Sequence, residues 1–306
     1  MKNILIVIIG PTAIGKTALS IQLANHFNCD ILSCDSRQFF KEMEIGTAVP
    51  NKEELAAATH HFIQNKSIFD SYSVGDFEKE ALQKLDELFQ KNPIQVMVGG
   101  SGLYVDAVLK GFDEFPDIDP AVREEINTQY EALGIEYLQK KLQELDIDYF
   151  HYLEKTNPQT LQNPQRMKRF VEVCIGSGQT YSSFVGKRKN TRNFTPIVIG
   201  LEADRAIMYE RINRRVTIMM NEGLLEEVES LYPNKKLNAL QTVGYRELFD
   251  YLDHNTTLEL AVEEIKQNTR RFAKRQMTWF KRTENAIWFD FETPVNVIIE
   301  TISSKI

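Results

Sequence analysis

The chain has 306 residues, 42% of them hydrophobic, which is enough to form a sizeable core in one large or two smaller domains. No uncharged apolar run reaches about 18 residues, so we expect no segment that crosses a membrane. The net charge of −7 argues against a nucleic-acid partner only when the whole chain is averaged, because the charge is unevenly distributed.

The cysteines and the first residues indicate a cytoplasmic protein. Cys29, Cys34 and Cys174 are scattered and form no C-x-x-C pair, which is typical of reduced thiols rather than of a disulfide framework or a zinc site. The first residues pass directly into a predicted strand, so we expect no removable signal peptide.

A glycine-rich loop between a strand and a helix is the strongest motif. Residues 4–9 predict a buried strand and residues 18–27 predict a helix. Between them lies G-x-x-x-x-G-K-T, formed by Gly10, Pro11, Thr12, Ala13, Ile14, Gly15, Lys16 and Thr17. In such a loop the backbone N–H groups, the helix N-terminus and the lysine bind phosphate, and the threonine hydroxyl suits Mg²⁺. The motif predicts a site for a diphosphate or a triphosphate and does not choose between them.

Polar residues follow two further predicted strands. Residues 29–33 lead into Asp35, Ser36, Arg37 and Gln38, and residues 94–98 lead into a Gly-Gly-Ser turn that contains Ser101. Because the carboxyl ends of parallel strands share one edge of a sheet, we expect Asp35 and Ser101 to lie near the phosphate loop. A carboxylate there can order Mg²⁺ or remove a proton from a nucleophile, and a turn cap is the alternative.

The alternation of strands and helices up to residue 111 predicts an α/β fold with a parallel sheet. Residues 73–90 and 103–109 show helical patterns, whereas residues 41–70 are polar and predict irregular structure. That segment contains His60 and His61, which we interpret as packing or hydrogen-bonding groups, because adjacent side chains point to opposite sides of most elements.

Residues 112–196 predict a mostly helical insertion, with residues 1–111 and 197–306 forming the catalytic core. Helical patterns cover residues 122–133, 135–145 and 166–175, and strand-like runs resume at 197–201. Within the insertion a polar segment opens a basic helix, and we expect Lys187, Arg188 and Lys189 in a loop. An insertion of this kind can build substrate contacts or act as a lid.

Basic residues gather near the C-terminus and in the insertion. Residues 266–282 contain seven basic side chains and no acidic one, with Phe272, Trp279 and Phe280 among them. Residues 166–192 form a second basic cluster with one acid, Glu172. Basic groups interleaved with aromatic rings suit a phosphate backbone and stacked bases, and a solvated helix face is the alternative reading.

Two arginines on a predicted helix after residue 204 lie four residues apart. Arg211 and Arg215 therefore share one helix face and could clamp a pyrophosphate, or they could pair with Glu210 and Glu222. The helix at 258–280 and a last strand at 286–289 follow. A nucleotide hydrolase is disfavoured because no strong Walker B strand and no N-K-x-D signal are present, whereas a small-molecule kinase remains open.

Seven motifs in order along nearly the whole chain resemble those of the bacterial tRNA dimethylallyltransferase family. They are G-P-T-A-I-G-K-T at 10–17, D-S-R-Q at 35–38, G-T-A at 46–48, Y-S-V-G-D-F at 72–77, V-G-G-S-G-L-Y at 98–104, V-G-Y-R at 243–246 and T-R-R-F-A-K-R-Q-M-T-W at 269–279. The ordered set is highly specific, and it implies a P-loop NTPase-like parallel sheet with a helical insertion.

The resemblance implies transfer of a dimethylallyl group from dimethylallyl diphosphate to N6 of adenosine at tRNA position 37, beside the anticodon, with release of pyrophosphate. The phosphate loop and the arginines Arg211 and Arg215 then hold the diphosphate, with Mg²⁺ as cofactor at Thr17. The catalytic residues would be Asp35 as base, Ser101, which stands where the family usually has threonine, and Lys16.

The resemblance also implies contacts with the anticodon stem-loop of tRNA. The implied residues are Asp35, Ser36, Arg37, Gln38, Ser101, Arg123, Gln162, Asn163, Pro164, Gln165, Arg166, Leu240, Gln241, Thr242, Val243, Gly244, Tyr245, Arg271, Phe272, Ala273, Lys274, Arg275, Gln276, Met277 and Thr278. We expect a monomer without a protein partner. The alternatives are a prenyltransferase acting on free adenine nucleotides, a small-molecule P-loop kinase and a non-enzymatic P-loop RNA-binding protein.

Overall fold

The computed structural model describes residues 2–186 and 191–306. The chain forms two compact units, which we name unit 1 (Met1–Gly111 with Arg192–Ile306) and unit 2 (Phe112–Thr191). Lys187, Arg188 and Lys189, expected in a loop, lie outside the described residues. Within the described part of the chain, no helix is both long and apolar enough to cross a membrane.

Unit 1 is built on a parallel sheet, as predicted. Six strands run in the order β3-β2-β4-β1-β5-β6. Their bounds are β1 Asn3–Ile9, β2 Ile31–Ser33, β3 His60–His61, β4 Ile94–Val98, β5 Phe194–Glu202 and β6 Ile287–Asp290. In the register of the central strands Ile8 pairs with Val98, and Val98 pairs with Ser33. The loops that follow β1, β2 and β4 therefore leave the sheet at one edge.

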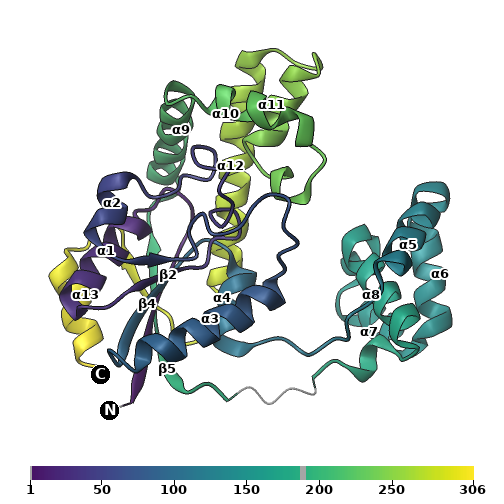
Figure 1. The fold of residues 1–306 in the computed structure, drawn as a ribbon, viewed down its shortest axis with the longest axis horizontal. Coiled ribbons are helices and arrows are strands. Elements are labelled where there is room, and N and C mark those ends of the chain that lie inside the picture. Colours follow the sequence, from purple (N-terminus) through teal and green to yellow (C-terminus); the bar gives the residue numbers. More distant parts are fainter. Residues whose placement is uncertain (1, 187–190) are drawn as a thin grey trace. The chain divides into compact units, whose positions relative to one another are not determined.

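Helices cover both faces of this sheet (Figure 1). Odd-numbered residues of β1 such as Val7 pack in one apolar cluster with α3 (Val74–Phe89) and α4 (Gly102–Lys110). Even-numbered residues such as Ile6 pack in another cluster with α1 (Lys16–Phe27), α9 (Arg205–Asn221) and α13 (Val295–Ser303). Burial on both faces explains why β1 is continuously apolar rather than alternating.

The helix α12 (Leu258–Phe280) contributes to all three apolar clusters of unit 1. Its first half carries Ile265 into a third cluster, which also contains residues of α10 (Leu224–Leu231) and α11 (Tyr245–Leu252). Ala273 reaches the cluster on one face of the sheet, and Phe280 reaches the cluster on the other. This packing fixes α12 along the edge of the sheet where the loops after β1, β2 and β4 emerge.

Unit 2 has an apolar core of its own. Four helices, α5 (Pro120–Leu133), α6 (Ile135–Leu145), α7 (Ile147–Thr156) and α8 (Pro164–Ser177), enclose Leu138, Met167 and Val171, among other residues. The helices predicted in this region are confirmed. The helix α7 was not predicted from the sequence, because its aromatic residues obscure the helical period. Short 3₁₀ helices occur at Pro158–Gln162, Tyr181–Ser183, Tyr232–Asn234 and Asn238–Leu240.

Two expectations about the strands of the sheet were wrong. The segment 41–70 is not wholly irregular, because it contains α2 (Lys52–Ala57) and the edge strand β3. A capping box between Asn51 and Glu54 starts α2, a signal that is short and easily overlooked. The strand β5 begins at Phe194, three residues before its predicted start, because Phe194 packs into the core beside Phe89.

Candidate functional site

The phosphate loop has the left-handed backbone that its glycines predict. Gly10 and Gly15 have φ angles of 146° and 108°, and a Cβ atom on Gly10 would lie 2.7 Å from the carbonyl oxygen of Leu201. α1 begins directly after Gly15, so its N-terminal N–H groups open toward the loop.

Lys16 lies beneath this loop beside Asp35 and Arg215. Its Nζ donates a 2.8 Å hydrogen bond to the carbonyl of Pro11. Burial lowers the pKa of Lys16 to about 8, Asp35 opposes this change and Arg215 adds to it. The negative charge of Asp35 therefore does not offset the burial of Lys16 and the nearby charge of Arg215, as expected for a site that binds an anion.

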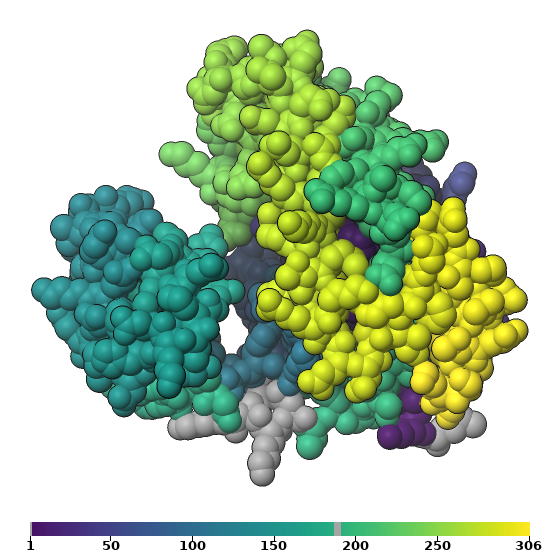
Figure 2. Space-filling model, turned by 180° about the vertical axis from the view of Figure 1, so that it is seen from behind, coloured from purple at the N-terminus to yellow at the C-terminus, as the bar shows by residue number. Residues whose placement is uncertain are grey.

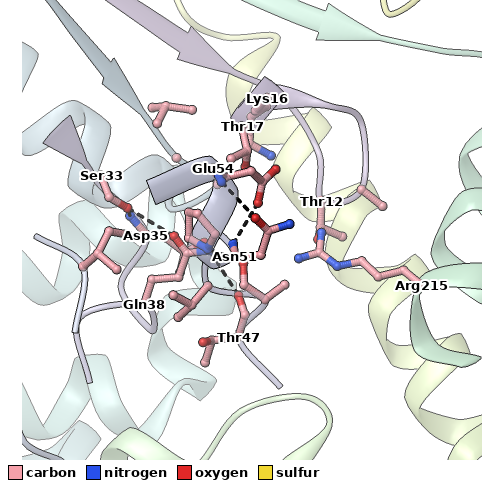
Figure 3. Close-up of a pocket in the computed structure, with 18 of the residues that line it drawn as sticks. Thr12, Lys16, Thr17, Ser33, Asp35, Gln38, Thr47, Asn51, Glu54 and Arg215 are labelled. Atoms are coloured by element: carbon pink, nitrogen blue, oxygen red, sulfur yellow. Dashed lines mark hydrogen bonds between the residues drawn. The ribbon is translucent and has the colours of Figure 1, made fainter. Parts of the chain in front are cut away.

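Two cavities of unit 1 meet at the edge of the sheet. One, of about 780 Å³, is lined by the phosphate loop, Arg211 and residues 47–51. The other, of about 600 Å³, is lined by residues 35–37, residues 100–104 and α12. Thr12, Asp35 and Arg215 line both. Figure 3 shows part of the first cavity, with the side chain of Arg215 extending from α9 toward Thr12. A molecule bound on one side would meet a molecule bound on the other at Asp35.

Asp35 has one carboxylate oxygen engaged in the turn that carries it. Its Oδ1 accepts a 3.0 Å hydrogen bond from the N–H of Arg37, so Asp35 caps the turn, as the alternative interpretation expected. Among the described residues Oδ2 has no hydrogen-bond partner, which leaves it available to a ligand. Ser101 supports the same turn, because its Oγ accepts from the N–H of Ser36 and donates to Ser36 Oγ, both at 3.0 Å.

Arg211 and Arg215 both approach the phosphate loop from α9. Arg211 Nε donates to the carbonyl of Ala13 at 2.8 Å, and Arg215 Nη1 lies 3.4 Å from Thr12 Oγ1. Burial lowers the pKa of Arg215, an effect that Asp35 opposes. In the part of the chain that the structure describes, neither arginine forms an ion pair, so the alternative pairing with Glu210 and Glu222 is not present. Their charges remain available to an anion.

Gln276 joins α12 to the phosphate loop. Its Oε1 accepts a hydrogen bond from the N–H of Thr12, and its Nε2 donates to the carbonyl of Gly100. The side chain is buried and both ends of its amide are used within the protein. The family resemblance implies that Gln276 contacts tRNA. Its internal role could not be predicted, because nothing in a helix sequence reveals which loop an amide side chain will reach.

The other residues of α12 and the loop before α11 divide into buried and exposed groups. Leu240, Tyr245 and Ala273 are buried in the core, so their side chains are not at the surface. Those that are exposed are Gln241, Arg271, Phe272, Lys274, Arg275 and Thr278, while Thr242, Val243 and Met277 are half-buried. Gly244 has a φ angle of 97° and, like residues 241–243, lines the second cavity. Figure 2 shows the yellow-green atoms of α12 at the surface of unit 1.

Six of the predicted tRNA contacts, Arg123 and residues 162–166, belong to unit 2. Asn163 caps α8, because its Oδ1 accepts from the N–H of Arg166 at 3.2 Å, and Pro164 follows at the first helical position. The side chains of Gln162, Gln165 and Arg166 are exposed. Arg123 is held by two hydrogen bonds to Glu172, of 3.2 and 2.8 Å, although 64% of its side chain is exposed.

Glu227 is a site residue that the sequence analysis missed. Its carboxylate accepts hydrogen bonds from the N–H groups of Glu44, Ile45 and Gly46, at 2.9, 2.7 and 3.0 Å, and from the Tyr245 hydroxyl. Glu227 thereby fixes the loop that contains Thr47, a residue that lines both cavities. The loop in turn accepts hydrogen bonds from Gln38 through the carbonyls of Thr47 and Ala48. Nothing in the sequence indicates which backbone N–H groups a carboxylate on this helix will reach.

The histidines are hydrogen-bonding groups, as expected. His61 Nε2 lies 2.8 Å from Asp30 Oδ2, and His60 Nδ1 lies 2.8 Å from the carbonyl of Ala58. Within residues 2–186 and 191–306 no group of three or more His, Cys, Asp or Glu side chains could hold a metal ion. A metal at this site would therefore need oxygen atoms from its ligand as well as from the protein.

Comparisons with known proteins show which proteins this chain resembles. Residues 38–283 match the model of a family described as IPP transferase. The tRNA dimethylallyltransferases of Flavobacterium psychrophilum and Flavobacterium johnsoniae are 71% and 70% identical to this chain, over 99% and 97% of it and 99% and 96% of theirs.

Solved structures also resemble the fold. The tRNA isopentenylpyrophosphate transferase of Bacillus halodurans is 35% identical with a TM-score of 0.73, covering 99% of this chain and 97% of that one. A eukaryotic dimethylallyltransferase acting on tRNA has a TM-score of 0.82 at 24% identity, covering 99% of this chain and 79% of its own, and it supports the fold alone.

Proposed function

Because the chain belongs to the IPP transferase family, we propose that it transfers a dimethylallyl group from dimethylallyl diphosphate to N6 of an adenosine in tRNA. The acceptor is adenosine 37, next to the anticodon, and pyrophosphate is the second product. The observation that carries this proposal is the meeting of two cavities at Asp35, since the reaction needs a diphosphate and a base on opposite sides of one carboxylate.

The diphosphate binds in the first cavity. Backbone N–H groups of the phosphate loop, the N-terminus of α1 and the charges of Lys16, Arg211 and Arg215 face the position of the leaving group. An allylic diphosphate ionises when its developing negative charge is stabilised by fixed cations and dipoles. Binding a dianionic group also raises the pKa of Lys16 again, so that it stays protonated through the reaction.

Oxygen donors at the site fit Mg²⁺. Thr17 Oγ1 has no hydrogen-bond partner among the described residues, and its hydroxyl is a hard oxygen donor of the kind that Mg²⁺ prefers. Such an ion keeps several waters and binds phosphate oxygens, which is consistent with so few protein ligands. When bound, the ion neutralises charge on the departing pyrophosphate.

Asp35 acts on the acceptor base. As N6 of adenine forms its bond to C1 of the dimethylallyl group, the C1–O bond breaks and its electron pair leaves with pyrophosphate. The proton released from N6 goes to Asp35 Oδ2, because Oδ1 is already engaged by the N–H of Arg37. Ser101 acts through Ser36 by holding the turn that carries Asp35.

The RNA lies against α12 and the loops beside it. Arg271, Lys274 and Arg275 are exposed on α12, and the guanidinium of Arg275 lies 5.7 Å from the ring centre of Phe272. Cations and rings on one surface attract the phosphate backbone and stack with bases. Extruding the adenine from the anticodon loop brings it into the second cavity. The enzyme acts as a monomer in the cytoplasm, where its RNA substrate is found.

A prenyltransferase for free adenine nucleotides is the second candidate. It is not favoured, because a small acceptor needs no exposed row of cations along α12. The test is one incubation of the protein with Mg²⁺ and dimethylallyl diphosphate in which the acceptor is unmodified tRNA, AMP or ATP. We expect N6-(dimethylallyl)adenosine among the tRNA nucleosides and no prenylated product from the free nucleotides; prenylated AMP would support the second candidate instead.

A further inference from the structure

Unit 2 contains a cavity that neither the diphosphate nor the acceptor adenine uses. Its volume is about 640 Å³, within the range of small-molecule sites, and it lies between α7, α8 and the segments beside them. The lining combines the rings of Tyr149, Tyr152 and Tyr181 with the guanidinium groups of Arg166 and Arg169. Among the described residues no acidic side chain lines it, and its two arginines make the lining basic.

The tyrosines belong to a ladder of aromatic rings. Tyr152 stacks on Tyr149 with 5.9 Å between ring centres and 23° between planes. Tyr149 contacts Tyr181 at 4.9 Å, and Tyr181 stacks on Phe115 at 4.8 Å. Phe115, Tyr149 and Tyr181 are half-buried, whereas Tyr152 at the other end of the ladder is 57% exposed. A further flat ring can extend such a stack without any rearrangement of the protein.

Polar groups surround this open end of the ladder. Arg166 Nη1 donates a 3.3 Å hydrogen bond to Thr160 Oγ1, which directs its guanidinium along the cavity. Of the two arginines in the lining, Arg169 forms an ion pair with Glu172 at 2.9 Å. Arg166 forms no ion pair with a carboxylate among the described residues, so its charge is available to a ligand. Asn157 and Gln165 add amide groups that can donate to and accept from the edge of a base.

We propose that this cavity binds one unpaired nucleotide of the RNA substrate, with its base stacked on Tyr152 and its phosphate on Arg166. An aromatic platform, a guanidinium and amide groups together are the means by which proteins hold splayed, single-stranded RNA. This inference rests on the proposed function, since it takes the RNA to be the tRNA that is prenylated. The nucleotide is a different one from the acceptor adenosine, which enters unit 1.

Unit 2 would then contribute to the affinity for the RNA substrate through this one nucleotide. A stacked base contributes enough that losing the ring should weaken RNA binding roughly tenfold. The loss should appear in the KM for tRNA and in the direct Kd for an anticodon stem-loop. The KM for dimethylallyl diphosphate and the kcat at saturating tRNA should not change, because the cavity contacts neither the diphosphate nor the reacting atoms.

Three variants test this directly. Tyr152→Ala should raise the Kd for an unmodified anticodon stem-loop roughly tenfold, whereas Tyr152→Phe, which keeps the ring, should match the wild type. Leu133→Ala is the matched control, because Leu133 is an equally exposed apolar residue of unit 2, 58% exposed, outside the cavity. Equal Kd values for Tyr152→Ala, Leu133→Ala and the wild type would overturn the inference.

A second measurement uses the unaltered protein. An anticodon stem-loop with 5-iodouridine at one loop pyrimidine at a time, irradiated in the complex, should give an adduct that mass spectrometry locates at Tyr152 or Tyr149. Adducts confined to unit 1 for every position would contradict the proposal. These binding measurements do not depend on activity. If the wild type fails to prenylate tRNA, the proposed function is wrong. If the wild type prenylates tRNA but Tyr152→Ala leaves the Kd for the stem-loop unchanged, only this inference is wrong.

Discussion

The N–H of Thr12 donates a 2.9 Å hydrogen bond to Oε1 of Gln276, a residue 264 positions later in the chain. The other end of the same amide donates to the carbonyl of Gly100 at 2.8 Å. One buried side chain of α12 therefore holds both the phosphate loop and the turn that precedes Ser101. Gln276 therefore connects the walls of the two cavities, both of which it lines.

Removing this link should loosen the phosphate loop. In Gln276→Met the side-chain volume is kept but the N–H of Thr12 and the carbonyl of Gly100 lose their partner, which costs about 1–3 kcal/mol for each buried group. We expect a lower melting temperature and a KM for dimethylallyl diphosphate raised about tenfold. Gln267→Met, at an exposed position of the same helix, serves as the control. An unchanged KM would show that the link does not position the loop.

Asp35→Asn should stop transfer without releasing the RNA. The amide keeps an oxygen that can accept from the N–H of Arg37, so the turn stays folded. It cannot take up a proton, and loss of a general base typically lowers kcat about 10²- to 10⁴-fold. Single-turnover rates and the Kd for tRNA measure the two effects separately. Wild-type turnover in this variant would remove Asp35 from the chemistry.

The pKa of Lys16 predicts opposite effects of pH on binding and on stability. As the pH rises through about 8 the free enzyme loses this charge, so affinity for pyrophosphate should fall above that pH. The folded pKa is lower than the usual 10.5, so the unfolded chain binds more protons between the two values and the free energy of unfolding should rise there. Below about 8 the cost of the buried charge is fully present.

Calorimetric titration with pyrophosphate, and denaturant unfolding of the free protein, would measure these two dependences. Lys16→Met is the comparison, since it lacks the titrating group but keeps much of the side-chain volume. Its affinity for pyrophosphate should be weaker and should show no inflection near pH 8. The same inflection in Lys16→Met would assign the titration to another group.

The exposed cations of α12 predict a salt-dependent interaction with RNA. Lys274→Ala should weaken tRNA binding and reduce the slope of log K against log salt by about 1, because one phosphate contact is lost. Lys305→Ala, exposed at the C-terminus, removes the same charge elsewhere in the chain and should leave the slope unchanged. Equal slopes for both variants and the wild type would count against α12 as the RNA surface.

The sequence predicted those parts of the site that follow from local chemistry. The phosphate loop needs glycines at φ values other residues avoid, and the loops after β2 and β4 must lie at one edge once the strands are parallel. The strand pattern alone therefore located Asp35 and Ser101 at that edge. Helical spacing placed Arg211 and Arg215 on one helix face but left open whether they bind an anion or pair with acidic residues; both line the first cavity.

Contacts between distant segments could not be predicted in this way. Glu227 binds three backbone N–H groups near residue 45, and Gln276 binds the phosphate loop, but a carboxylate or an amide on a helix looks the same when it is solvated. Tyr152 belongs to α7, which was not predicted at all, so the aromatic ladder of unit 2 had no sequence signal. These roles depend on packing, which determines what lies opposite each side chain.

The stoichiometry of the products tests the central claim most directly. The protein, Mg²⁺, dimethylallyl diphosphate and unmodified tRNA are incubated together, and pyrophosphate and N6-(dimethylallyl)adenosine are counted in the same sample. The account predicts one pyrophosphate released for each modified adenosine, with the modified base at tRNA position 37 and no product when that adenosine is replaced by another base. Pyrophosphate release without modified adenosine, or phosphate transfer from ATP in its place, would contradict it.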